Sequence, residues 1–311
     1  MTGGTTAGYS ERSPMSSASA TGMVLESGGL PPELQKAIGR VTEISLLPEI
    51  TTRIVEVVED PKSTAQDMHR IIRNDPALAA KVLKVVNSAL YGLPAQIASL
   101  DRAIVMLGLS AVKNIALAAS LTRLFRPGSI SDRFSARNLW KHCISVGVCA
   151  RLVAEASIGH GEEAFVAGLV HDMGLLVEYQ VFPEKLKEVV HRCEATPQDF
   201  CTVEREVIGA DHQAFGAALA AKWKFPPGLR SAIAYHHTPE RLAPEFRKLV
   251  TVIQMADIMC CQNTLGFHLT ACASDVTQDM LDYVGVDEAC IGELLQVLPE
   301  RIDETERILA D

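Results

Sequence analysis

Apolar residues recur at intervals of three and four positions along most of this chain, which is the spacing of one buried face of an α-helix. Residues 47–61 follow this pattern behind Pro48, a residue that favours the first turn of a helix. The apolar face of this segment consists of Ile50, Ile54, Val57 and Val58. Because the segment is rich in Val and Ile, a strand is the alternative there. The whole pattern nevertheless predicts an all-α protein with no significant sheet.

Residues that cap helices mark several of the expected boundaries. Ser63 and Gln66 have the spacing of a capping box. Asp75 followed by Pro76 predicts another helix start, and Gly92 is expected to end that helix. In the second half, apolar periodicity predicts helices at residues 132–156, 162–180, 184–194, 212–224, 227–237 and 245–261.

Changes in composition divide the chain into four parts. Residues 1–29 are rich in Gly, Ser and Thr with few large apolar residues, so we expect a disordered N-terminal tail. The segment "RPGSISD" at residues 126–132 separates two apolar helices and predicts a boundary between two packed helical lobes. The expected parts after the tail are an N-terminal lobe at 30–130, a second lobe at 131–265 and C-terminal helices at 266–311.

Composition narrows the class of protein. The 311 residues are 48% hydrophobic, which is ample for a sizeable core. The longest apolar run, residues 103–125, contains Lys113 and Asn114 near its middle and fits a buried helix pair better than a membrane span. The N-terminus lacks the pattern of a secretory signal, and the eight cysteines form no CxxC pair, so we expect a cytoplasmic protein. A net charge of −9 without a basic stripe disfavours a nucleic-acid partner.

Seven residues of metal-ligand type lie on helix faces that are otherwise apolar. His142 continues a stripe through Leu139 and Val146, and Asp257 lies in the apolar stretch "LVTVIQMADIMCC". An isolated charge is costly in a core, so inward His and Asp side chains indicate either mutual pairing or a bound cation. The candidate ligands are His142, His171, Asp172, His212, His236, His237 and Asp257.

The simpler interpretation is that such histidines are core residues bonded to the backbone. It applies most strongly to His142, whereas the adjacent pairs His171–Asp172 and His236–His237 favour a ligand role more. No GxSxG, HExxH or phosphate-binding glycine loop is present to indicate another chemistry. The remaining histidines, expected at the surface, are His69, His160, His191 and His268.

The order His, His-Asp, His, His-His, Asp on successive helices resembles the HD superfamily of metal-dependent phosphohydrolases. The segments "LLPEITTRIVEVVEDP", "DPALAAKVLKVVNSALYG" and "SLDRAIVMLGLSAVKNIALA" narrow the resemblance to the HDOD family, the HD-related output domain of bacterial signalling proteins. The resemblance extends from about Leu46 to Asp257. It implies an all-helical, multi-helix fold in two lobes, of which the second is HD-like, and a regulatory role in which the HD site has often decayed.

The resemblance also implies what the candidate site would hold. In the related HD-GYP branch the matching positions coordinate two metals, which hydrolyse phosphoesters without a protein nucleophile. It therefore implies a mono- or dinuclear centre of Fe, Mn, Zn or Mg, with Asp172 as the bridging ligand and, if the chain is an enzyme, as its catalytic residue. An upstream acidic position that adds a ligand in some relatives is Asn138 here.

Two departures from the HD-GYP pattern weaken the enzyme interpretation. Gly174-Leu175 stands where that pattern has Gly-Lys, so a cation that could meet a phosphate is missing. "TPERLAPEF" follows His237 without a GYP motif, so cleavage of cyclic di-GMP is not expected. Three other cations are candidates for a phosphate clamp: Lys141, Lys222 and Arg241. The helical spacing of Lys141 directs its side chain away from the ligand face.

Three functions follow from these patterns, and whether the chain is an enzyme stays open among them. The favoured one is a bacterial signalling module that acts through association with a protein partner and keeps a partly preserved metal pocket, which could also take a nucleotide or phosphoester ligand. The alternative is a metal-dependent phosphohydrolase acting on an unidentified phosphoester. The third is a scaffold whose histidines pair with Asp172 and Asp257, which would tolerate joint replacement of both carboxylates by apolar residues.

Overall fold

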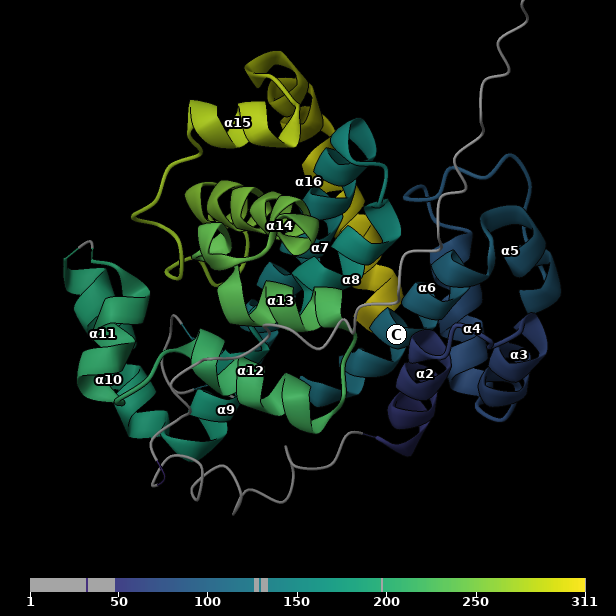
Figure 1. Ribbon diagram of the computed structural model, residues 1–311, viewed down its shortest axis with the longest axis horizontal. Helices are drawn as coiled ribbons and strands as arrows, with labels where there is room; N and C mark the ends of the chain where they lie inside the picture. Colours follow the sequence, from purple (N-terminus) through teal and green to yellow (C-terminus); the bar gives the residue numbers. More distant parts are fainter. Residues whose placement is uncertain (1–31, 33–47, 126–128, 130–133, 197, 311) are drawn as a thin grey trace, which may run out of the picture.

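The computed structural model describes residues 32, 48–125, 129, 134–196 and 198–310, and its regular secondary structure is helical (Figure 1). Within these residues the one β-type pairing is an isolated bridge between Ser129 and Ser135. The all-α prediction is therefore confirmed. The expected tail at residues 1–29, and all of the 126–132 segment except Ser129, lie outside the described residues. None of the described helices is both long and apolar enough to cross a membrane.

The helices of the first half pack against one another around a shared apolar core. They are α2 (Glu49–Glu59), α3 (Ala65–Arg73), α4 (Pro76–Val86), α5 (Leu100–Leu107) and α6 (Leu109–Leu121), followed by the short 3₁₀ helix η1 (Thr122–Leu124). The helix–strand alternative for residues 47–61 is settled in favour of the helix, and Ile54 is fully buried on its inner face.

Two expected helix boundaries in this half are wrong. Thr64 rather than Ser63 caps α3: its side chain accepts from the backbone N–H of Asp67, whose carboxylate accepts from the N–H of Thr64 in return. Ser63 instead donates its hydroxyl to backbone carbonyls of the preceding turn, at Val57 and Asp60. Gln66 has no part in the capping box.

The second error concerns the end of α4. Asp75 caps the start of this helix as predicted, with Pro76 in the first turn. The helix ends at Val86 rather than near Gly92, with Asn87 as its C-cap residue. The Asn87 amide donates to the carbonyl of Ile97 at 2.8 Å and its oxygen accepts from the Ile97 N–H at 2.6 Å.

The helices of the second half include the long α7, against which α8 and α14 pack and whose inner stripe is almost completely buried. They are α7 (Ala136–Ser157), α8 (Gly161–Val170), α9 (Met173–Val181), α10 (Pro183–Ala195), α11 (Phe200–Val207), α12 (His212–Lys222), α13 (Pro227–Tyr235), the 3₁₀ helix η2 (Pro239–Arg241) and α14 (Pro244–Gln262). The single helix expected at 162–180 is wrong, because the chain turns between α8 and α9 at His171 and Asp172.

The last two helices are α15 (Gln278–Val284) and α16 (Glu288–Ala310), and α16 connects the two groups described above. It lies along α7 and continues to α4, where its last turns are seen in Figure 1. The Nζ atom of Lys81 donates to the carbonyl of Leu309 at 2.9 Å, and the N–H of Ala89 donates to Glu304 at 2.8 Å. The lobe boundaries near residues 130 and 265 stay a prediction.

Gly174 allows the backbones of α9 and α12 to approach very closely. A Cβ atom built on Gly174 would lie 1.8 Å from the carbonyl oxygen of His212 and 2.9 Å from the amide nitrogen of Gly216. Both neighbours are backbone atoms, which cannot move aside as a flexible side chain can. The turn at residues 171–172 therefore places α9 against the start of α12 only if residue 174 has no side chain.

We expect Gly174→Ala to lower the free energy of unfolding by about 3 kcal/mol, because overpacking against fixed atoms costs this order of energy. Gly292→Ala is the matched control, since it lies in α16 and a Cβ there meets no atom within 4 Å. That control should change stability by less than about 1 kcal/mol, in the stabilising direction. Urea unfolding measures both, and equal stabilities would contradict the close approach of α9 to α12.

Candidate metal centre

The fold brings all seven predicted residues to one place in the interior. His142 comes from α7, His171 and Asp172 from the turn between α8 and α9, and His212 is the first residue of α12. The end of α13 supplies His236 and His237, and α14 supplies Asp257. Six of the seven side chains are fully buried, and His237 is 15% exposed. Five separate segments therefore converge on one site, and His237 is the one of the seven residues that is partly exposed.

One half of the site is built around His142 and His171. The Nε2 atom of His142 lies 3.1 Å from Asp257 Oδ1 and 3.6 Å from Asp172 Oδ2. The Nε2 atom of His171 lies 3.4 Å from Asp172 Oδ2 and 3.9 Å from Asp257 Oδ1. Two imidazoles and two carboxylates thus face a common point.

The other half uses the second oxygen of Asp172. Its Oδ1 atom lies 3.3 Å from His212 Nε2 and 3.5 Å from His236 Nε2. The Nε2 atom of His212 is also 3.1 Å from the Nε2 atoms of both His236 and His237. Asp172 therefore lies between the two halves and presents one oxygen to each.

The hydrogen bonds of the outer ring nitrogens, Nδ1, determine which of the inner nitrogens, Nε2, carry lone pairs. Three of the rings have Nδ1 close to an acceptor oxygen, which requires a proton on Nδ1 and leaves the Nε2 lone pair directed into the site. The three contacts are His171 to the carbonyl of Gly168 at 2.7 Å, His236 to the carbonyl of Ala232 at 3.0 Å, and His212 to Glu204 Oε2 at 2.8 Å. Lone pairs of nitrogen and carboxylate oxygen accordingly point at one another.

Burial and charge set the protonation of the site. Burial opposes ionisation of Asp172, but His171, His236 and His212 outweigh it and hold its pKa well below the usual range. The pKa of Asp257 is lowered in the same way, against burial, by the hydrogen bond and charge of nearby histidines. Burial lowers the pKa of His171 to about 4. Both carboxylates are thus ionised, while this ring stays neutral.

These residues fit divalent cations. Several inner atoms are buried without a hydrogen-bond partner in the described part of the chain: His142 Nε2, His171 Nε2 and both oxygens of Asp172. Metal–ligand bonds of about 2.0–2.2 Å to nitrogen and oxygen place neighbouring donors roughly 3–3.5 Å apart, close to the short separations within each half. Two of the donor sets among the described residues consist of these ligands alone: His142, His171 and Asp257, and Asp172, His212, His236 and His237. Imidazole and carboxylate together suit Zn, Fe or Mn.

The cations considered as a phosphate clamp are not at the site. Lys141 points away from it, with its Nζ atom 3.9 Å from Glu306 on α16. Lys222 and Arg241 are exposed. Leu175, which stands at the position of the missing lysine, is completely buried in the core. Among the described residues, no ion pair of the seven involves Lys or Arg.

A tight turn after α14 covers the His142 side of the centre. Gly266 has a φ of +82°, and a Cβ there would lie 2.4 Å from the amide nitrogen of His142. The next residue, Phe267, donates its N–H to the carbonyl of Asn138 at 3.0 Å and is 1% exposed. This segment packs directly on α7 and excludes water from that side.

Sequence reasoning missed the residues that support the ligands. Glu204 contacts His212, the Gln213 side chain accepts from the N–H of His237, and the thiol of Cys261 donates to Asp257 Oδ1 at 3.3 Å. One signal was available: Glu178 lies inside the apolar stretch "MGLLVEYQV", as Asp257 does in its own helix. Nothing in the sequence spacing connects Glu204 to Glu178 or to Asp257.

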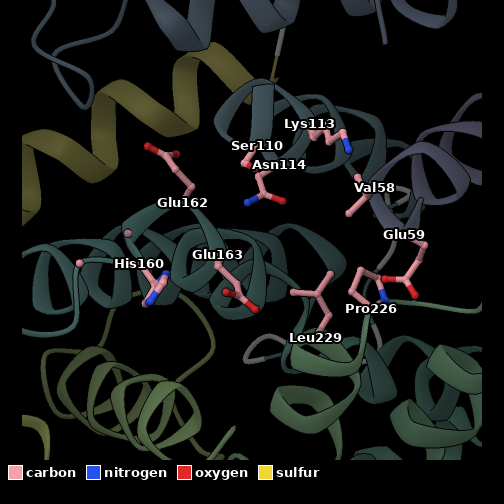
Figure 2. A pocket seen from close by; sticks show the side chains of 12 residues that line it. Val58, Glu59, Ser110, Lys113, Asn114, His160, Glu162, Glu163, Pro226 and Leu229 are labelled. Carbon is pink, nitrogen blue, oxygen red and sulfur yellow. The ribbon is translucent and has the colours of Figure 1, made fainter. Parts of the chain in front are cut away.

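A cavity of about 390 Å³ lies between the two groups of helices, and we call it the junction cavity. Figure 2 shows Lys113 and Asn114 of α6 on one wall and Glu163 and Leu229 on the other. Its walls belong to α2, α6 and the first turns of α8 and α13. Both α8 and α13 end beside the metal centre, so each spans from the junction cavity to a pair of candidate ligands.

The remaining histidines occupy the surface to different degrees. His160, at the start of α8, and His191 are exposed as expected, and His160 lines the junction cavity. His69 and His268 are half-buried. No ligand group of the described residues contains any of these four.

We expect divalent cations to stabilise the protein, because they bind the converging lone pairs of the folded state only. Added Mn²⁺ or Zn²⁺ at about a thousand times the dissociation constant should contribute about 4 kcal/mol, seen as a rise in Tm over chelator-treated protein. Asp172→Ala should remove most of this rise. A Tm unaffected by metal in the unaltered protein would show that the donors do not bind a cation.

Comparison with protein-family models identifies the family of this chain. The family model described as the HDOD domain matches residues 44–239. A curated protein from Treponema pallidum, described only as uncharacterized, is 27% identical over 227 residues, which cover 70% of this chain and 42% of that protein. The chain thus spans less than half the length of this relative.

Solved structures share the fold. An HDOD domain protein of unknown function from Geobacter sulfurreducens has a TM-score of 0.74 at 23% identity, over 88% of this chain and 96% of that one. A candidate signal transduction protein from Marinobacter aquaeolei has a TM-score of 0.69 at 25% identity, over 90% and 65%. A candidate phosphohydrolase from Shewanella amazonensis has a TM-score of 0.69 at 23% identity, over 89% and 98%.

Proposed function

Because this chain belongs to the HDOD family, we propose that it is a regulatory module of bacterial signal transduction that acts in the cytoplasm by association with a protein partner. In this proposal the HD-type centre holds one or two divalent cations, with Asp172 shared between the two halves. The name of the Marinobacter aquaeolei protein, a candidate for signal transduction, agrees with such a role.

The observation that supports a regulatory role is the path of α8 and α13. Each helix lines the junction cavity at its start and is followed by two candidate ligands at its end: His171 and Asp172 after α8, His236 and His237 after α13. A helix of 10 residues such as α8 is about 15 Å long and moves as one body. Cation binding that draws these ligands together therefore shifts the helices where they meet α2 and α6.

A phosphohydrolase is the second candidate, supported by the two donor sets and by the name of the Shewanella amazonensis protein. Two divalent ions in such a site activate water and neutralise charge on a phosphoryl oxygen. In this chain Asp172 and the five histidines would hold the ions, and Asp257 would complete the first half. A phosphoester would have to enter beside His237, the one partly exposed member of the seven.

Two features favour regulation over hydrolysis. Leu175 is buried in the core where the catalytic relatives place a lysine, so no cation from that position meets a phosphate. The junction cavity does not offer a phosphate site either, because its wall includes the carboxylates of Glu59, Glu162 and Glu163. A nucleotide or phosphoester bound there would face like charges.

We expect metal binding to slow backbone hydrogen–deuterium exchange at α8, α13 and the facing residues of α2 and α6 in the full chain. The reason is that ordering the ligands at one end of α8 and α13 restrains their other ends at the junction cavity. Exchange is compared with and without Mn²⁺, with Asp172→Asn as the control that should not respond. Protection confined to the ligand residues would contradict a regulatory role.

The same protein should not hydrolyse generic phosphodiesters or phosphomonoesters in the presence of Mn²⁺ or Fe²⁺. The closed site and the absence of a clamp at Leu175 give the physical reason. A screen with chromogenic phosphoesters measures this. Turnover that is lost in Asp172→Asn would establish the phosphohydrolase in place of the regulatory module.

A further inference from the structure

Two buried carboxyl groups stand behind His212, on the side away from the metal centre. Glu204 of α11 lies 2.8 Å and 3.0 Å from the Nδ1 atom of His212 through its two oxygens, and one of them also accepts from the His212 N–H at 3.1 Å. Glu178 of α9 is completely buried, and the strongest charge acting on it is that of Glu204. The three residues belong to three different helices that meet at this point.

Two carboxyl groups that share an apolar space cannot both be ionised without a large cost. Burial, followed by the charge of Glu204, raises the pKa of Glu178 well above its usual range. Burial also raises the pKa of Glu204 well above its usual range, although bonds from Glu178 and from the His212 backbone oppose this shift. The geometry assigns the roles: Glu204 accepts from the backbone N–H of His212 at 3.1 Å, so its oxygens act as acceptors and a proton shared by the two carboxyl groups lies on Glu178.

This arrangement accounts for groups that are otherwise unexplained. Neither oxygen of Glu178 has a hydrogen bond of regular geometry within the described residues, although a buried carboxyl without a partner is destabilising. An apolar residue would fill this position in the core at lower cost. A carboxylic acid there gains a partner only by donating its proton toward Glu204.

We propose that Glu204 is a positioning residue for the metal centre, itself oriented by Glu178. Glu204 holds the proton of His212 on Nδ1 and fixes the ring, so that the Nε2 lone pair faces Asp172, His236 and His237. It thereby sets the cation affinity of the His212 half of the centre, leaving the half built on His142 and His171 unaffected. This inference rests on the cation-holding centre of the proposed function.

Glu204→Gln is the sharpest change, because it keeps the shape of the side chain but replaces one acceptor oxygen by a donor that opposes a His212 N–H. Titration calorimetry of the full chain with Mn²⁺ should show a loss of affinity of about 10–100-fold in the His212 half only, as is usual when the partner of a ligating histidine is removed. Glu206→Gln, an exposed residue of the same helix paired with Arg192, is the matched control and should bind as the unaltered protein does.

Two substitutions of Glu178 distinguish a positioning role from simple packing. Glu178→Gln keeps a neutral donor toward Glu204 and should retain the affinity, whereas Glu178→Leu keeps the volume but not the donor and should weaken the same half. These two Glu178 variants also test the proposal if Glu204→Gln does not fold. Nitrogen-15 histidine spectra of metal-free protein provide a second readout, in which His212 changes from the Nδ1–H to the Nε2–H form in Glu204→Gln.

The outcomes distinguish the two proposals. Unaltered protein that binds no Mn²⁺ overturns the proposed centre and this inference with it. Two-site binding that Glu204→Gln leaves unchanged, or weakens equally in both halves, overturns the inference while the centre stands. Equal affinities in Glu178→Gln and Glu178→Leu show that Glu178 only fills space, and they remove it from the proposal.

Discussion

The repulsion between converging lone pairs is the constraint on which the second half of this structure depends. Neighbouring histidines hold the pKa of Asp172 well below its usual range, and the Nε2 atoms of His171, His212 and His236 present lone pairs rather than protons to the site. Such an arrangement is unfavourable by itself, so the packing of five helices must hold it in place. The close approach at Gly174, the covering turn at Gly266 and the hydrogen bonds behind three of the rings all serve that purpose. The core around α7 thus stabilises a site that opposes its own assembly.

The sequence allowed the fold class and the inward direction of the seven candidate residues to be predicted for a simple reason. A polar residue on an otherwise apolar helix face, such as Asp257 among the aliphatic residues of α14, is visible in a window of a dozen positions. The turn that carries Asp172 was not visible, because residues 164–177 are apolar except at His171 and Asp172, and the break depends on contact with α12. The cap of α3 is Thr64 rather than Ser63, and the sequence pattern alone does not decide between two adjacent residues that can both cap a helix.

The support for the ligands was harder to predict than the ligands themselves. Glu178 and Glu204 are 26 positions apart and belong to helices whose meeting is a property of the whole fold. Each is an acid in an apolar neighbourhood, yet only their joint burial gives one the role of donor and the other that of acceptor. Leu175 has a similar lesson. The resemblance to the HD-GYP pattern indicated a lost phosphate clamp at this position, and the structure shows Leu175 as part of the core.

The C-terminal helix α16 affects how the protein unfolds. It lies outside residues 44–239, yet it packs along α7, where Glu306 meets Lys141, and it reaches α4 and the segment after it through Leu309 and Glu304. A segment that binds both groups of helices links their melting, because neither can loosen without giving up its contacts with the same helix. We therefore expect the two groups of helices to unfold together under heat or denaturant, because α16 limits how independently either group can unfold.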